Sequence, residues 1–340
     1  MEQFVDPKML ASLAEVYRLT MRLTLVCVVF VPLERLFAAH PQRIFRKQIL
    51  IDLAYYVMNS LIVAMFLSFP IGLMTWSLQK SLPATILTLT TTLPVWARLC
   101  LGLVVSEVGY YWGHRLSHTI PWLWDYHVVH HSAEQMDFMV NTRAHPVDLV
   151  FTRLCSLAPQ YAIGLGGLAT GEGSWIPIVL ALFGLFWGYF LHANLRWRFG
   201  LLERAISTPG FHHWHHTLNG PINKNYASTL PLLDWIFGTL HLPKELPDHY
   251  GVSSAVPDSL LAQLALPVSP SAPSLRRLKR TTKHETALSQ LPKITADELA
   301  TEVDSWQKTT LADEQTTRDS LFVHENGSAA PLYKATTSQS

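Results

Sequence analysis

The sequence predicts an all-α integral membrane protein with about four to five transmembrane helices. Charged residues make up 15% of the 340 residues, against about 25% in a typical soluble domain. The mean hydropathy is positive, at +0.18, and the apolar residues are gathered in long runs, as is typical of membrane spans. The net charge of +1 gives no support for nucleic-acid binding, so we expect no nucleic-acid partner.

Five apolar runs account for this number of spans, at residues 19–33, 53–76, 82–113, 147–170 and 175–195. The clearest is 53–76, which is uncharged for 24 residues and would be about 36 Å long as a helix. As one helix, 82–113 would be about 48 Å long, more than the roughly 30 Å hydrocarbon core. Its last turns should therefore project from the bilayer, and Pro94 predicts a kink. The last two runs could instead form a re-entrant hairpin.

Lysines and arginines beside the runs predict the orientation. The segments around Arg43, Arg115 and Arg196 share one face if every run crosses, whereas loops 79–81 and 171–173 are nearly bare of positive charge. Positive charge favours the cytoplasmic side, in a bacterial cytoplasmic membrane or the endoplasmic reticulum. The polar segments after the third and fifth runs are therefore expected on the cytoplasmic side, and the N-terminus outside.

These polar segments contain three histidine clusters with the spacings HxxxH, HxxHH and HxxHH. They are His114 and His118, then His127, His130 and His131, then His212, His215 and His216. Side chains three and four residues apart share a helix face, so each cluster can converge. Zinc takes about three or four protein ligands, and even an octahedral ion takes six, so eight imidazoles predict two adjacent metal ions. We expect a cytosolic helical cap that holds this histidine-rich dimetal site.

The type of ligand does not identify the metal, because imidazole binds zinc, copper, iron and nickel. A zinc protease of the HExxH type needs Glu after the first histidine, and that position is Arg115. A metal-transport protein would place ionisable groups inside the spans, whereas these histidines lie beyond the apolar runs. A zinc-dependent membrane hydrolase and a metal-transport protein are therefore kept only as alternatives.

Two further histidines are candidate ligands, His192 and His145. His192 ends a long apolar run, where an unpartnered ring would be costly. His213 is interpreted as a neighbour of the ligands rather than as one of them.

A ligating imidazole usually gives its other N–H to a carboxylate or a carbonyl. Three acids near the clusters are candidates for this role: Glu107, Asp125 and Asp234. Glu107 lies seven residues before His114, two helical turns away on nearly the same face.

The three histidine boxes resemble those of the fatty acid hydroxylase and sterol desaturase superfamily of membrane di-iron enzymes. Flanking segments at 110–112, 143–146, 192–194 and 233–239 resemble the family's signatures, and the likeness covers about residues 20–250. Glu107 stands where many relatives carry Asp. The resemblance implies two iron ions that use O2 and two electrons to hydroxylate a C–H bond of a fatty acyl or sterol-like lipid. Desaturation on the same centre is the alternative, and zinc could replace iron in purified protein.

Composition, together with the extent of the resemblance, predicts three parts of the chain. Residues 1–18 form an N-terminal segment, 19–252 the membrane catalytic domain, and 253–340 a polar, largely disordered tail with one short helix expected at 295–307. No GxGxxG motif for a flavin or nicotinamide is present, so electrons must come from a separate donor. A b-type cytochrome, a ferredoxin or a reductase would serve, while the lipid substrate would come from the bilayer.

Overall fold

The computed structural model describes residues 6–165, apart from 82, 84, 87–89 and 91, and residues 175–269 and 272–274. Every regular element in these ranges is a helix, and strand pairing there is limited to two isolated bridges, Ala38 with Leu195 and Thr217 with Tyr250. The prediction of an all-α protein is confirmed for this part of the chain. The predicted loop at 171–173 and tail helix at 295–307 lie outside it.

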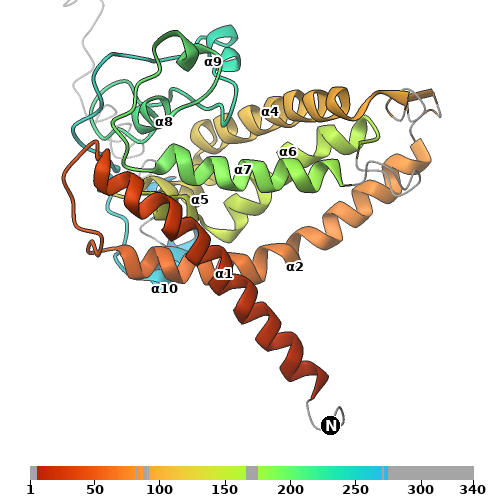
Figure 1. Cartoon of the computed structure of the whole chain (residues 1–340), viewed down its shortest axis with the longest axis horizontal. Helices are drawn as coiled ribbons and strands as arrows, with labels where there is room; N and C mark the ends of the chain where they lie inside the picture. The colour runs from red at the N-terminus through yellow and green to blue at the C-terminus, as the bar shows by residue number, and fades with distance from the viewer. Residues whose placement is uncertain are drawn as a thin grey trace, which may run out of the picture. The chain divides into compact units, whose positions relative to one another are not determined.

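The long helices of the described ranges are α1 (Pro7–Leu36), α2 (Ile49–Ser81), α4 (Val95–Thr119), α6 (Pro146–Ala162) and α7 (Ile176–His192). Helix α6 packs against both α4 and α2, and α7 packs against α4 (Figure 1). The C-terminal ends of α4 and α7 and the N-terminal ends of α2 and α6 lie together, at the left of Figure 1. This end of the helices carries the histidines.

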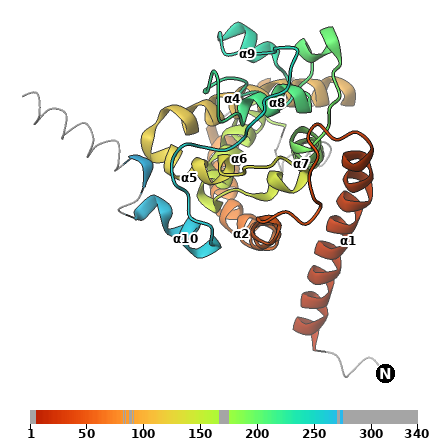
Figure 2. The same cartoon turned by 90° about the vertical axis from the view of Figure 1, so that its left-hand side faces the viewer.

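Short helices gather at the same end (Figures 1 and 2). They are α5 (Pro121–His131), η1 (Phe138–Thr142), η3 (Gly200–Arg204), α8 (Pro209–His215), α9 (Leu232–Ile236), α10 (Leu260–Ala265) and η4 (Leu266–Val268). Proline begins α5 and α8, at Pro121 and Pro209, where its missing N–H costs no hydrogen bond. Thr208 caps α8 by accepting a hydrogen bond from the Phe211 N–H at 3.3 Å. Local sequence thus fixes where these histidine-bearing helices start.

The sequence predicted a helix kinked at Pro94, but in the structure Pro94 lies at the start of a helix. It is the N-cap of α4, with an extended backbone at φ −62° and ψ 153°. Proline lacks the N–H that a helix interior uses and disfavours helical geometry in the residue before it. Helix α4 therefore begins afresh at Val95 and runs on to Thr119, so that His114 and His118 lie on its last turns.

One helix in the described ranges, Lys8–Leu36, is long and apolar enough to cross a membrane. Within α2, the pieces Ile49–Ile62 and Met65–Met74 are bent by 41° and pass the same test together. The N-terminal half of α1 projects beyond the other helices (Figures 1 and 2), and apolar side chains there, such as Leu13 and Tyr17, are exposed. The count of four to five spans stays a prediction.

Two glycines let α4 and α6 approach closely. A Cβ added to Gly109 would collide with the backbone carbonyl oxygen of Cys155, and one added to Gly113 would lie 2.7 Å from the Cys155 Cβ. Small residues at such crossings are typical of helices that pack in membranes. The histidines of α4 are thereby held against the first turns of α6.

Part of the segment predicted as a polar tail folds onto α5 and α2. Leu266 is 1% exposed and packs with Tyr55 of α2 and with Val128 and Val129 of α5. The Ser274 N–H donates to Asp125 at 2.9 Å. Apolar side chains of α10 and η4 interrupt an otherwise polar sequence, and their burial explains why the fold continues beyond residue 252.

Candidate metal centre

Nine histidines converge in two neighbouring groups. Group A consists of His114, His118, His127, His131 and His215, and group B of His130, His192, His212 and His216. Within each group, one ligand nitrogen per histidine lies within 4.8 Å of all the others. The structure thus brings together the eight box histidines and His192.

The two HxxHH boxes are each divided between the groups. His127 and His131 of α5 belong to group A, whereas the intervening His130 belongs to group B. The third box has the reverse pattern, in which only His215 joins group A. Because an α-helix turns about 100° per residue, positions i and i+4 share a face while i+3 lies to one side. One short helix can therefore supply both groups.

Five of the nine rings use Nδ1 to hold an outward partner. Four of these partners are backbone carbonyls: those of Tyr226 for His114, Arg143 for His130, Gly188 for His192 and Lys224 for His215, at 2.7 to 2.9 Å. The fifth is a carboxylate, because His127 Nδ1 lies 3.0 Å from Asp148 Oδ2. Carbonyls and carboxylates accept hydrogen bonds, so Nδ1 carries the proton and the Nε2 lone pair faces the cluster.

The pair His130 and His192 shows what this arrangement needs. Their Nε2 atoms face each other at 3.2 Å, but each ring has its proton on Nδ1, so neither Nε2 can donate. Two lone pairs at this distance repel unless a cation lies between them. Two ligands each about 2.1 Å from one ion, and about 90–110° apart, lie roughly 3.0–3.4 Å from each other. The separation therefore fits two ligands of one metal ion.

Group A shows the same feature. The Nε2 atoms of His114, His118 and His215 are buried without a hydrogen-bond partner among the described residues. Buried polar atoms of this kind are rare without a ligand, ion or water. The residues present fit a metal ion in each group.

The groups are neighbours. The rings of His131 in group A and His216 in group B stack with their centroids 4.3 Å apart, and those of His130 and His216 are 4.7 Å apart. This spacing fits two ions side by side, as the number of histidines predicted.

Burial keeps these imidazoles neutral. Desolvation, with a smaller effect of the neighbouring His127, lowers the pKa of His114 to about 3 and that of His130 to about 4. Since a metal binds the neutral ring, both side chains are ready to ligate at pH 7 without first losing a proton.

His145 and His213 lie outside both groups. His145 caps α6, where its Nδ1 accepts from the Val147 N–H at 3.2 Å, and its Nε2 lies 3.2 Å from the Leu264 carbonyl. His213 also uses both ring nitrogens, with the Ala193 carbonyl at 3.1 Å and the Tyr250 hydroxyl at 3.0 Å.

The three acids singled out in the sequence do not hydrogen-bond to a histidine of the cluster. Glu107 accepts from the Thr229 and Leu230 N–H groups, and Asp125 accepts from Ser274. Asp234 accepts from the Tyr226 N–H at 2.8 Å. It therefore helps to fix the peptide chain whose carbonyl holds His114.

The acid that does contact the cluster is Asp148, which the sequence analysis did not select. It lies in the first turn of α6, is 5% exposed, and also accepts from Ser117 Oγ at 3.2 Å. In the sequence, the signal for Asp148 was that it follows His145, a candidate ligand, by three residues.

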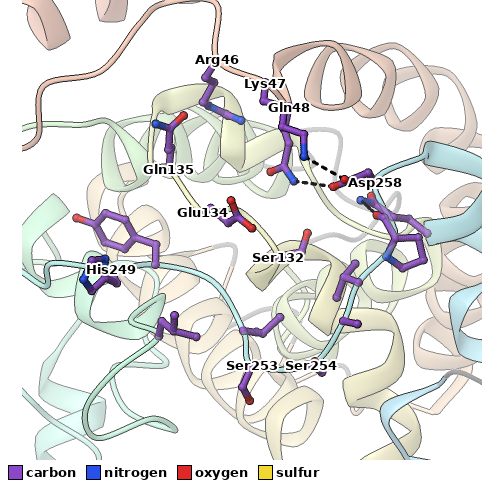
Figure 3. Close-up of a pocket in the computed structure, with 17 residues that line it drawn as sticks. Arg46, Lys47, Gln48, Ser132, Glu134, Gln135, His249, Ser253, Ser254 and Asp258 are labelled. Carbon is purple, nitrogen blue, oxygen red and sulfur yellow. Dashed lines mark hydrogen bonds and ion pairs between the residues drawn. The ribbon is translucent and has the colours of Figure 1, made fainter.

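A separate polar cavity of about 770 Å³ lies between residues 46–48, residues 132–135 and the segment 249–258 (Figure 3). Lys47 and Gln48 contact Asp258 at one edge of it, at 3.1 and 3.4 Å (Figure 3). None of the nine histidines lines this cavity. The cavity is therefore distinct from the space between the nine histidines.

Residues 99–239, which contain all nine histidines, match the family model described as fatty acid hydroxylase. The chain is 35% identical over 179 residues to the ornithine lipid hydroxylase OlsE of Rhizobium tropici, covering 52% of each protein. It is 30% identical over 151 residues to the alkylglycerol monooxygenase of Homo sapiens, covering 44% of this chain and 31% of that protein. With methylsterol monooxygenase 2-2 of Arabidopsis thaliana it shares 27% over 155 residues, covering 43% and 55%.

The chain thus spans about half the length of the bacterial and plant relatives and less than a third of the human one. No solved structure matches the chain.

Proposed function

The chain belongs to the fatty acid hydroxylase and sterol desaturase superfamily, and we propose that it is a membrane-bound di-iron oxygenase. It uses O2 and two electrons to hydroxylate a C–H bond of a lipid. The relatives are named for ornithine lipids, alkylglycerols and methylsterols, so the substrate class proposed here is a lipid with a long apolar part.

One observation carries the proposal, the convergence of nine imidazoles in two adjacent groups, five of them held with the Nε2 lone pair turned inward. Nine ligands exceed what a single ion accepts, and an ion in each group accounts for all of them. When bound, two iron ions supply the activation of O2 and the attack on an unactivated C–H bond. The same imidazoles also bind zinc, so zinc in purified protein would be a substitution.

The protein's own residues hold and orient this centre. Asp148 and four backbone carbonyls fix the tautomers of five rings, so that each presents Nε2 without rearrangement. Burial excludes water from the ligands, since His114, His131 and His216 are at most 3% exposed. A dry and pre-arranged site favours chemistry on the lipid over release of reactive oxygen.

The membrane supplies the substrate in this proposal. Helix α1 and the bent helix α2 are the candidate spans, and the histidine groups lie where α4 and α7 end. A lipid chain could then reach the centre without leaving the apolar phase. We propose a multi-pass topology with the histidines on the cytoplasmic side, where a separate electron donor would reach them.

Isotope labelling in cells tests this function. A strain expressing the chain is grown under 18O2, and its lipids are compared by mass spectrometry with those of a strain expressing His130→Ala with His215→Ala. The proposal predicts a lipid hydroxyl carrying one 18O atom that is missing from the variant. A new double bond without 18O would assign desaturation instead. Identical lipids, with no iron in the purified protein, would overturn the proposal.

A further inference from the structure

We propose that Asp52 and Asn59 of α2 are positioning residues for group B, acting through residues 142–144 on His130. The inference rests on the proposed function, in that group B must hold an iron ion. It extends the centre to α2, which contributes no histidine to either group.

Asn59 holds the backbone on both sides of Arg143. Its side-chain amide donates to the Ala144 carbonyl at 2.9 Å and to the Thr142 carbonyl at 3.3 Å. The backbone at Arg143 is extended, at φ −73° and ψ 90°, and successive carbonyls of an extended chain point to opposite sides. The carbonyl of Arg143 therefore points away from Asn59, and it accepts from His130 Nδ1 at 2.9 Å.

Asp52 holds the same residue by its side chain. Arg143 Nε donates to Asp52 Oδ1 at 2.5 Å, and both side chains are 0% exposed. The Thr142 hydroxyl donates to the Asp52 backbone carbonyl at 2.8 Å. Arg46, placed between Asp52 and Asp137, completes the buried ion pairs. The side chain of Arg143 and the backbone on both sides of it are thus hydrogen-bonded to α2.

The sequence position of these two side chains is unusual. Asp52 and Asn59 are seven residues apart, two turns on one face of a helix that is otherwise mainly apolar. Polar side chains in such a helix are costly and are typically kept for function. Here both converge on one peptide segment, and among the described residues that segment hydrogen-bonds to the cluster through His130.

The consequence is selective. Without the Asn59 amide, the backbone on both sides of the Arg143 carbonyl loses two hydrogen bonds, and the acceptor that fixes the tautomer of His130 is held less firmly. Outward partners of metal ligands typically change metal affinity by about 10–100-fold. Asn59→Leu keeps the side-chain size and removes both donors, so we expect about a 10-fold or greater loss of iron affinity in group B with group A unchanged.

The test is the iron content of purified, iron-reconstituted protein, with 57Fe Mössbauer spectra to separate the two sites. Wild type and the control Ser68→Ala, whose hydroxyl bonds only within α2, should both hold two irons. When a chelator buffers free iron at a level that just fills both wild-type sites, Asn59→Leu should hold about one iron, with a single remaining spectrum. In a His192→Ala background, where group B is already empty, Asn59→Leu should remove no further iron.

Retention of group A's iron also reports that the variant is folded. Loss of both irons would show a general structural role, and two irons with an unchanged spectrum would show no role; either result overturns the inference. An iron-free wild type would instead refute the proposed function, so the two failures are distinguishable.

Discussion

Replacing Gly109 by alanine tests how closely α4 and α6 must approach for the metal centre to form. The added Cβ would meet the carbonyl oxygen of Cys155 and would also lie 2.9 Å from Pro159 Cγ. A backbone oxygen cannot rotate away, so the helices must separate by on the order of 1 Å to restore contacts near 3.5 Å. Overpacking of this kind costs about 1–3 kcal/mol.

Gly184→Ala is the matched control. It also lies within a long helix, but a Cβ there meets nothing within 4 Å, so only the gain in helix propensity of about 1 kcal/mol remains. Both glycines lie inside helices, so both variants gain this propensity, and they should differ in stability by the overpacking cost of about 1–3 kcal/mol.

The assay is thermal unfolding in detergent, with iron content measured on the same samples. Gly109→Ala should unfold at a lower temperature than wild type and lose iron from group A, because α4 carries His114 while α6 carries Asp148. Gly184→Ala should match or exceed wild type. Equal stability and iron content in the two variants would refute the close packing of α4 on α6.

The other predictions concern the histidines and their partners. His192→Ala should lose one of two irons, whereas His145→Ala should keep both. Metal analysis of the two purified variants measures this, and the reverse result would make His145 the ligand in place of His192. Asp148→Asn should weaken iron binding in group A by about 10–100-fold in a chelator competition. An unchanged affinity would show that the carboxylate does not orient His127 for metal binding. Metal-free protein should lose stability as the pH falls below about 6.5. Unfolded histidines then take up protons, while the buried His114 and His130, with pKa values of about 3 and about 4, stay neutral. The stability that depends on these histidines being neutral is fully present above pH 6.5 and is lost progressively as the pH falls to 3–4. Urea titrations from pH 8 to 5 measure it, and a flat profile would contradict the burial of these rings.

The spacing of the histidines in the sequence was enough to predict most residues of the candidate site. HxxxH and HxxHH place their histidines on shared helix faces, and the structure has helices at those positions. His192 was identifiable because a polar ring at the end of an apolar run needs a partner. The division of each HxxHH box between two groups required the relative placement of α5 and α8, which spacing within one helix does not determine.

The outward partners of the rings were harder to predict. Four of the five are backbone carbonyls, and any residue type can supply a carbonyl. Asp148 was missed because it is distant in sequence from His127 and reaches it only through the packing of α6. Glu107 and Asp234 were chosen for their closeness in sequence, but they bind backbone N–H groups instead. Sequence distance is a poor guide to such contacts.

The most direct test of the two-metal centre is the iron content of protein purified from iron-supplied cells. We expect about two iron ions per chain, falling to about one in His192→Ala. A single metal ion per chain in the wild type, unchanged by His192→Ala, would contradict it.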